Sequence, residues 1–148
     1  MKFLYFLILS FVLICCNNDT HFDFIEKAIK SQNQTYDFKN HVIIIPNAGC
    51  LGCITVAEDF AKKHAGEDFY IIFTNISSLK LLKTKLGDVS TYPNIIYDTE
   101  NIFFSFYDES IYPCIVYIEE GEVNKIEYQS VEFPDTFNKF ETFLTDQL

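Results

Sequence analysis

Hydrophobic and polar residues alternate along the chain in blocks that predict helices and strands in turn. Apolar residues recur at helical spacing from Phe22, in a helix expected to end by Gln34, whereas residues 42–45 form a continuous Val/Ile run. Such a run is typical of a strand covered on both faces. A second helical pattern over 54–64, with Glu58 expected on its outward face, and a second apolar run over 69–73 follow. This order predicts parallel strands joined by helical crossovers.

The middle of the chain predicts a short helix and a further strand. Leucines over 79–86 have helical spacing after a cap at Asn75 or Ser77, and residues 94–97 are strand-like. The aromatic run over 102–107 fits either kind of element, so we assign it to neither.

The last third predicts an antiparallel hairpin and a final helix. Two strand-like runs, 114–118 and 123–128, flank a turn containing Gly121, and helical spacing resumes over 134–146. Together the elements predict an α/β fold of one domain, with a mixed sheet of four or five strands and helices on both faces.

The N-terminus, MKFLYFLILSFVLICC, predicts an export signal. Its apolar run is too short to cross a ~30 Å hydrocarbon core. The end of the run resembles a bacterial lipobox, and cleavage before Cys16 would leave the small Cys15 at the last signal position. We therefore expect a lipoprotein signal peptide over 1–15, lipid on Cys16, a tether and N-terminal helix over 16–37, and the folded domain over 38–148.

The alternatives to a lipoprotein signal are an ordinary cleaved signal and an uncleaved anchor. A lipid on Cys16 would hold the domain on a membrane, on the extracytoplasmic side of a bacterial cell envelope, at the periplasmic face or the outer membrane.

The charge composition excludes one class of partner. The chain carries 21 acidic and 11 basic residues with no basic cluster, so nucleic acid is not an expected partner.

The candidate chemistry lies in the stretch HVIIIPNAGCLGC, residues 41–53. A strand there delivers Cys50 and Cys53 to the first turn of a helix, where unpaired N–H groups and the helix dipole favour a thiolate. If Cys15 leaves with the signal and Cys16 is lipidated, Cys114 is the one other cysteine expected in the mature domain, which then holds three. An odd number of thiols excludes a framework of several bridges.

The cysteine pair has three interpretations: an active redox pair, an inert structural disulfide, or part of a Cu(I) or Zn(II) site with Cys114. The metal interpretation lacks a fourth ligand, because the histidines are expected in the tether, at the far end of the strand and at the far end of the helix (His21, His41 and His64). Cys114 itself is either a candidate third thiol or a small core residue.

The order strand, C-x-x-C, helix, strand, helix, extra segment, proline, hairpin, helix resembles the thioredoxin fold, over roughly residues 38–147. NAGCLGC resembles its redox loop, Ile111-Tyr112-Pro113 its cis-proline site, and YIEEGEV (117–123) the turn joining its last strands. The segment 94–108 looks like the insertion of the TlpA-like and peroxiredoxin-related branch, which includes lipoprotein thiol-disulfide oxidoreductases.

The resemblance implies that Cys50 attacks a substrate disulfide and that Cys53 resolves the mixed disulfide. It also implies a cis bond before Pro113, with the backbone of Tyr112 pairing with an extended substrate segment. The alternative for Pro113 is an ordinary trans proline opening a strand. The expected partners are protein thiols and disulfides, with no cofactor.

The chain departs from the thioredoxin pattern in three places. Gly49 stands where an aromatic residue usually precedes the first cysteine, Ile44 stands where thioredoxin has a buried carboxylate, and Leu51-Gly52 replaces Gly-Pro. These differences favour a specialised or slow enzyme over a general reductase.

A second class of function is a lipid-anchored binding module whose disulfide is inert. Its partner surface would come from aromatic residues of the inserted segment and the proline site (Phe103, Phe104, Phe106, Tyr107 and Tyr112).

Overall fold

The computed structural model describes residues 20–146, so the predicted signal peptide and Cys16 lie outside the described residues. The helices are α2 (His21–Tyr36), α3 (Leu51–His64), α4 (Leu79–Leu86) and α5 (Thr136–Asp146), with short 3-10 helices η1 (Gly87–Thr91) and η2 (Asp108–Ile111). The strands are β1 (His41–Pro46), β2 (Tyr70–Thr74), β3 (Ile95–Tyr97), β4 (Cys114–Glu119) and β5 (Glu122–Tyr128). Within residues 20–146 no helix is both long and apolar enough to cross a membrane.

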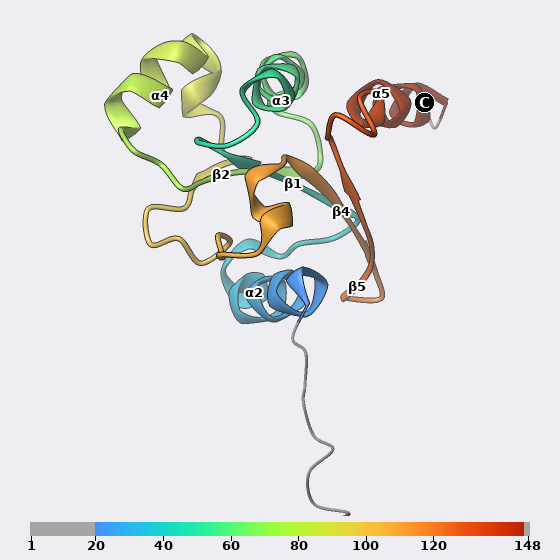
Figure 1. The fold of residues 1–148 in the computed structure, drawn as a ribbon. Coiled ribbons are helices and arrows are strands. Elements are labelled where there is room, and N and C mark those ends of the chain that lie inside the picture. The colour runs from blue at the N-terminus through green and yellow to red at the C-terminus, as the bar shows by residue number, and fades with distance from the viewer. Residues whose placement is uncertain (1–19, 147–148) are drawn as a thin grey trace, which may run out of the picture.

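The five strands form one mixed sheet in the order β3-β2-β1-β4-β5 (Figure 1). β1, β2 and β3 are parallel neighbours, whereas β4 runs antiparallel to β1 and β5 antiparallel to β4. β1 is therefore the central strand, and every residue of it after His41 is buried. The mixed α/β sheet predicted from the sequence is confirmed.

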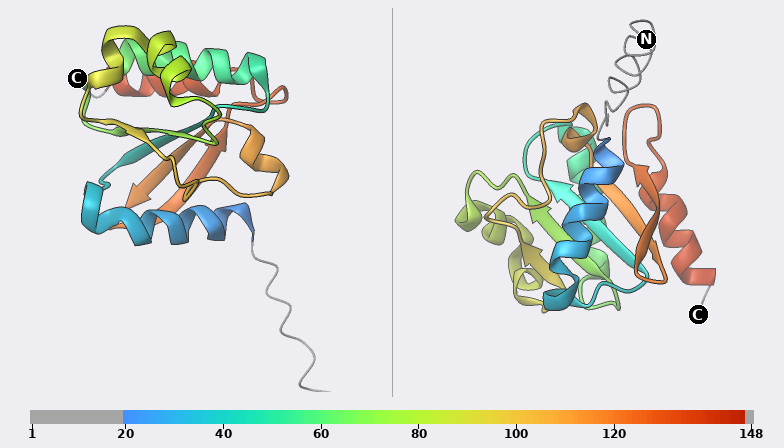
Figure 2. Two further views of the ribbon diagram at one scale, coloured as in Figure 1. Left: turned by 90° about the vertical axis from the view of Figure 1, so that its left-hand side faces the viewer. Right: turned by 90° about the horizontal axis from the view of Figure 1, so that it is seen from below.

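The sheet lies between two layers of helices, with α3, α4 and α5 over one face and α2 over the other (Figure 2). Successive residues of β1 point to opposite faces, as in any strand. Ile43 and Ile45 join the core under α3 and α5, and Val42 and Ile44 join the core over α2. This three-layer arrangement is consistent with the predicted thioredoxin-like α/β fold.

The predicted caps need one correction. The N-cap of α4 is Ser78, whose hydroxyl accepts a hydrogen bond from the N–H of Leu81, and not Asn75 or Ser77. A cap must stand immediately before the first helical residue for its side chain to reach the free N–H groups of the first turn.

The aromatic run over 102–107 contains no helix or strand in the structure. A single buried carboxylate organises its start. Asp98, which follows β3, accepts hydrogen bonds from the hydroxyl of Thr74 (2.8 Å) and from the N–H groups of Ile102 (2.9 Å) and Phe103 (2.8 Å). Phe103 packs in the core on the α2 side of the sheet, and the chain then continues through η2 to β4, on the other side of β1.

Candidate functional site

The two cysteines lie where β1 gives way to α3. Pro46 ends β1, Cys50 is the N-cap of α3, and Cys53 lies in the first turn. The two residues form a disulfide, with their Cα atoms 5.3 Å apart. The sequence prediction of a thiol pair at a helix start is confirmed.

The two cysteines differ in exposure. Cys53 is 6% exposed, while Cys50 is half-buried and its neighbour Leu51 is 77% exposed. Cys50 is thus the more accessible residue of the pair. Its side chain makes no capping hydrogen bond, so a reduced Cys50 would lie beside helix N–H groups that favour an anion.

A close backbone contact joins the cysteine loop to the end of η2. The N–H of Cys50 donates a hydrogen bond to the carbonyl oxygen of Ile111, at 3.2 Å. Gly49 has a φ of +147°, and a Cβ built on it would lie 2.3 Å from the same Ile111 oxygen. No aromatic residue, nor any residue with a side chain, fits at position 49 without moving this contact.

The cis bond expected before Pro113 is wrong: every peptide bond among residues 20–146 is trans. Tyr112 has an extended conformation (φ −105°, ψ 137°) and leads directly into β4, so the chain needs no reversal there. Its N–H donates to the carbonyl of Glu109 at 3.0 Å. The Tyr112 donor is therefore occupied, and Pro113 is buried behind it.

Cys114 belongs to the core. It is 1% exposed, pairs with Ile44 on β1 and Tyr128 on β5, and lies in the apolar cluster over α2, whereas α3 covers the opposite face. Burial raises the pKa of its thiol to about 12. The core interpretation of Cys114 is confirmed, and the thiol is free.

Glu58 of α3 was expected to face solvent, and this is wrong because α4 packs over that side of α3. Glu58 is 1% exposed and forms an ion pair with Lys85 of α4. Among residues 20–146 neither carboxylate oxygen has a further hydrogen-bond partner. The available signal was its position four residues after the buried Ile54, on the edge of the apolar stripe.

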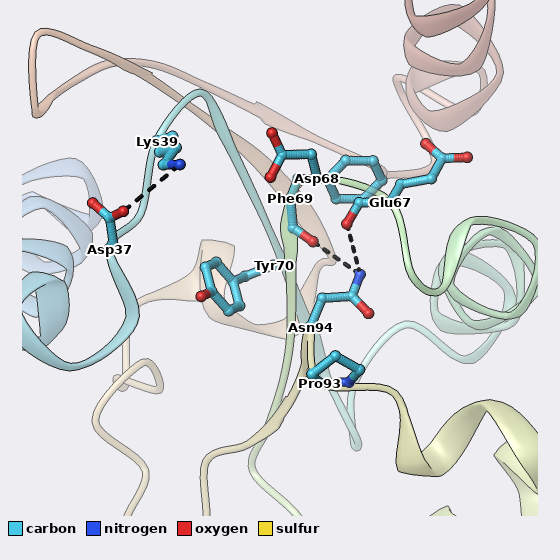
Figure 3. A pocket seen from close by; sticks show the side chains of 8 residues that line it. All are labelled: Asp37, Lys39, Glu67, Asp68, Phe69, Tyr70, Pro93 and Asn94. Atoms are coloured by element: carbon cyan, nitrogen blue, oxygen red, sulfur yellow. Dashed lines mark hydrogen bonds and ion pairs between the residues drawn. The ribbon is translucent and has the colours of Figure 1, made fainter.

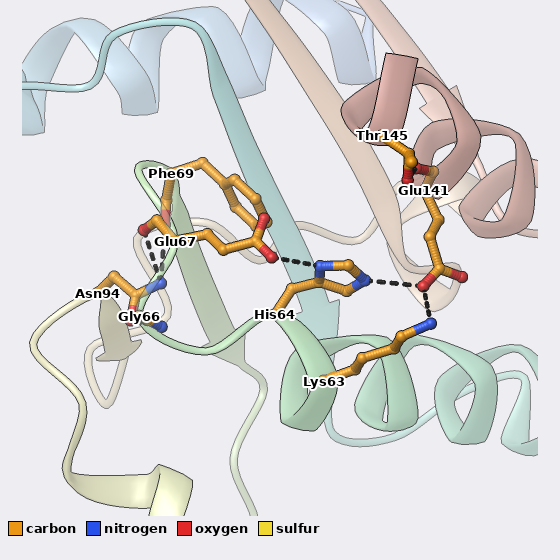
Figure 4. Close-up of polar contacts among 8 residues, drawn as sticks. All are labelled: Lys63, His64, Gly66, Glu67, Phe69, Asn94, Glu141 and Thr145. Atoms are coloured by element: carbon orange, nitrogen blue, oxygen red, sulfur yellow. Dashed lines mark hydrogen bonds and ion pairs between the residues drawn. The ribbon is translucent and has the colours of Figure 1, made fainter. Parts of the chain in front are cut away.

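The far end of α3 is tied to α5 by a polar cluster (Figure 4). Nδ1 of His64 lies 2.7 Å from Oε1 of Glu67, and its Nε2 lies 3.0 Å from Oε1 of Glu141. Lys63 pairs with the same carboxylate, and together with His64 it lowers the pKa of Glu141. These contacts fix the end of α3 that lies opposite to the disulfide.

The other two histidines also have partners other than the cysteines. His21, expected in the tether, is the first residue of α2 and is buried, with its Nδ1 2.7 Å from the hydroxyl oxygen of Tyr128. His41 begins β1 and packs against Tyr117 and Phe140. The part of the chain that the structure describes contains no group of three His, Cys, Asp or Glu side chains placed to hold a metal ion.

Figure 3 shows a polar pocket of about 180 Å³. It lies where β2 begins, at the opposite end of the sheet from the disulfide, because Tyr70 of its lining pairs with Val42 near the start of β1. Its lining includes the carboxylates of Asp37 and Asp68. The side-chain amide of Asn94 donates to the backbone carbonyls of Glu67 and Phe69, so this amide holds the loop before β2 in place. The pocket contains no thiol.

Most aromatic residues suggested as a partner surface are wholly or partly buried. Phe103 is 3% exposed, Tyr107 packs on His21, and Phe104 and Tyr112 are half-buried. Phe106 is the exception, with its side chain fully exposed.

No protein-family model matches the chain, and searches of curated proteins and of solved structures found no significant match. The chain is thus defined by its own fold and site: a three-layer α/β domain with a C-x-x-C disulfide at the start of a helix.

Proposed function

We propose that this protein is a membrane-anchored, extracytoplasmic thiol-disulfide oxidoreductase that exchanges disulfides with protein substrates through Cys50 and Cys53. The observation that carries the proposal is the unequal exposure of the pair: Cys50 is accessible at the N-cap of α3 and Cys53 is buried behind it. An attacking thiol must be accessible, whereas a resolving thiol needs only to reach its partner.

The reaction follows from this placement. The thiolate of Cys50 attacks one sulfur of a substrate disulfide, forms a bond to it and releases the other substrate sulfur as a thiolate. Cys53 loses its proton to solvent and attacks the sulfur of Cys50, which restores the Cys50–Cys53 bond and releases the second substrate thiolate. Two electrons pass from the pair to the substrate, and the reverse steps oxidise a substrate dithiol.

Tyr112 and Pro113 are the expected substrate-contacting residues, and the preceding residue supports this placement, because the carbonyl of Ile111 accepts a hydrogen bond from the N–H of Cys50. With the N–H of Tyr112 bonded to Glu109, the contact we propose is through side chains beside the disulfide rather than through an added strand.

The competing function is a lipid-anchored binding module with an inert disulfide. The hydrogen bond from the N–H of Tyr112 to Glu109 favours this function, because the backbone donor expected to pair with a substrate is already occupied. A reduction potential of the Cys50–Cys53 pair below about −300 mV, in the range of structural disulfides, would support the inert bridge and refute the exchange reaction.

The direct test uses the full chain in membranes with Cys53→Ser, which leaves Cys50 without its resolving thiol. We expect mixed disulfides with other proteins that disappear on reduction, and their loss in the matched control Cys50→Ser/Cys53→Ser. The same adducts in both variants, or adducts in neither, would contradict the proposal.

A further inference from the structure

The disulfide and the start of α2 lie at one end of the sheet, which we call the disulfide end. β1 finishes there at Pro46, and the pairings of Ile44 with Cys114 and of Cys114 with Tyr128 place the start of β4 and the finish of β5 at the same end. His21, the first residue of α2, contacts the hydroxyl of Tyr128. Figure 2 shows η2 and the start of α2 at this end.

This end of the sheet exposes large apolar side chains. Five of the nine exposed large apolar residues of the described chain lie there: Leu51 (77%), Phe106 (101%), Ile111 (41%), Val131 (80%) and Phe133 (62%). Leu51 is the first residue of α3, and the other four come from the segment before β4, which includes η2, and from the loop after β5. Scattered exposed apolar residues are ordinary, but a concentration at one end marks an interaction surface.

The sequence outside the described residues begins at this same end. The apolar stretch ends at Cys16, and α2 starts at His21, where Thr20 and Asp23 form a capping box. Five residues of extended chain reach at most roughly 18 Å. If the apolar stretch or a lipid on Cys16 is in a bilayer, the disulfide end is held close to its surface.

We propose that the disulfide end rests against the surface of the bilayer that holds the N-terminus, with Phe106, Leu51 and Val131 in contact with lipid. The loops 104–111 and 129–135 contain carboxylates and no Lys or Arg, so the surface fits neutral headgroups and is repelled by anionic ones. A consequence for substrates rests on the proposed function. In this orientation Cys50 faces the membrane surface, so its substrates are cysteines in membrane-proximal segments of other proteins.

The chain contains no Trp, so a single Trp reports position without background. The test places the full-length Phe106→Trp variant in phosphatidylcholine vesicles and compares its fluorescence with and without bromine on the lipid acyl chains. The matched control is Phe143→Trp, because Phe143 is also exposed (41%) but lies beside His41, at the opposite end of β1. Dividing the Trp fluorescence in brominated vesicles by that in unbrominated vesicles cancels the quenching by the nearby disulfide.

We expect at least a twofold loss of fluorescence in brominated vesicles for Phe106→Trp and little loss for Phe143→Trp, with the difference reduced by added phosphatidylglycerol. Equal quenching of the two variants, or stronger quenching of Phe143→Trp, would overturn the orientation and leave the apolar loops for contact with another protein. The readout involves no thiol chemistry, so it succeeds or fails independently of the adducts formed by Cys53→Ser.

Discussion

Replacing Gly49 by alanine is expected to destabilise the protein, because the contact beside the disulfide leaves no room for a methyl group. The new Cβ would lie 2.3 Å from the carbonyl oxygen of Ile111 and 2.9 Å from its Cα, and both are backbone atoms that cannot turn aside. Gly49 also has a φ of +147°, which a residue with a side chain adopts only under strain. Either the loop before Cys50 or the backbone at Ile111 must move.

The expected loss has two parts. Holding a residue with a side chain in a sparsely populated backbone conformation costs about 1–3 kcal/mol. Moving Ile111 away also breaks its 3.2 Å hydrogen bond from the N–H of Cys50, a net loss of about 1 kcal/mol. Together they predict that Gly49→Ala lowers the free energy of unfolding by about 2–4 kcal/mol, or Tm by roughly 6–15 °C for a domain of this size.

Urea and thermal unfolding followed by circular dichroism, with the disulfide kept oxidised, measure this loss. Gly52→Ala is the matched control: Gly52 lies in the first turn of α3, and no heavy atom lies within 4 Å of the position of its Cβ. A helical glycine replaced by alanine is expected to gain about 0.5–1 kcal/mol. Stability of Gly49→Ala within about 0.5 kcal/mol of the parent, the range of ordinary surface changes, would refute the reasoning.

Two further predictions concern buried titratable groups. Because burial raises the pKa of Cys114 to about 12, its thiol should resist alkylation at pH 8 in the folded protein and react after unfolding; Cys114→Ala should leave disulfide exchange unchanged, and a slower exchange would restore the third-thiol role. Burial lowers the pKa of His21, so the unfolded chain binds the proton more tightly: stability from this group is present above about pH 6.5 and is lost as pH falls through the lowered pKa. Tm measured from pH 7.5 to 5.5 should therefore fall less in His21→Phe than in the parent. Burial also lowers the pKa of His41, but His41 is present in both proteins and does not affect the comparison. An equal fall in Tm would contradict this role of His21.

The centre of the fold was predictable because its signals are local. The Val/Ile run of β1 is apolar at successive positions since helices cover both faces of the sheet, and the C-x-x-C spacing places Cys50 and Cys53 within one helical turn. The hairpin was equally clear, because Gly121 stands in a short turn between two strand-like runs. In the structure Glu120 and Gly121 form a two-residue turn, and both adopt positive φ.

What the sequence did not predict depends on contacts between distant segments. Glu58 is charged and was placed outside, but α4 packs over it and Lys85 supplies the opposite charge. His21 follows a polar stretch and was placed in the tether, but Tyr128, more than a hundred residues away, gives its ring a buried partner. No local pattern encodes either pairing, because each needs the finished packing of two layers.

The contact at Gly49 changes the meaning of the missing aromatic residue. Judged by sequence, glycine before the first cysteine removes an apolar wall beside the disulfide. In the structure the backbone of Ile111 occupies that space. The side chain of Ile111 is 41% exposed, and Leu51, which follows Cys50 in the chain, is 77% exposed. Apolar surface beside Cys50 is thus present but comes from a different loop, one that is bonded to the N–H of Cys50 and continuous with the exposed Phe106. If the pair exchanges disulfides as proposed, the loop before β4 limits which substrates can approach Cys50, and this favours a specialised enzyme over a general reductase.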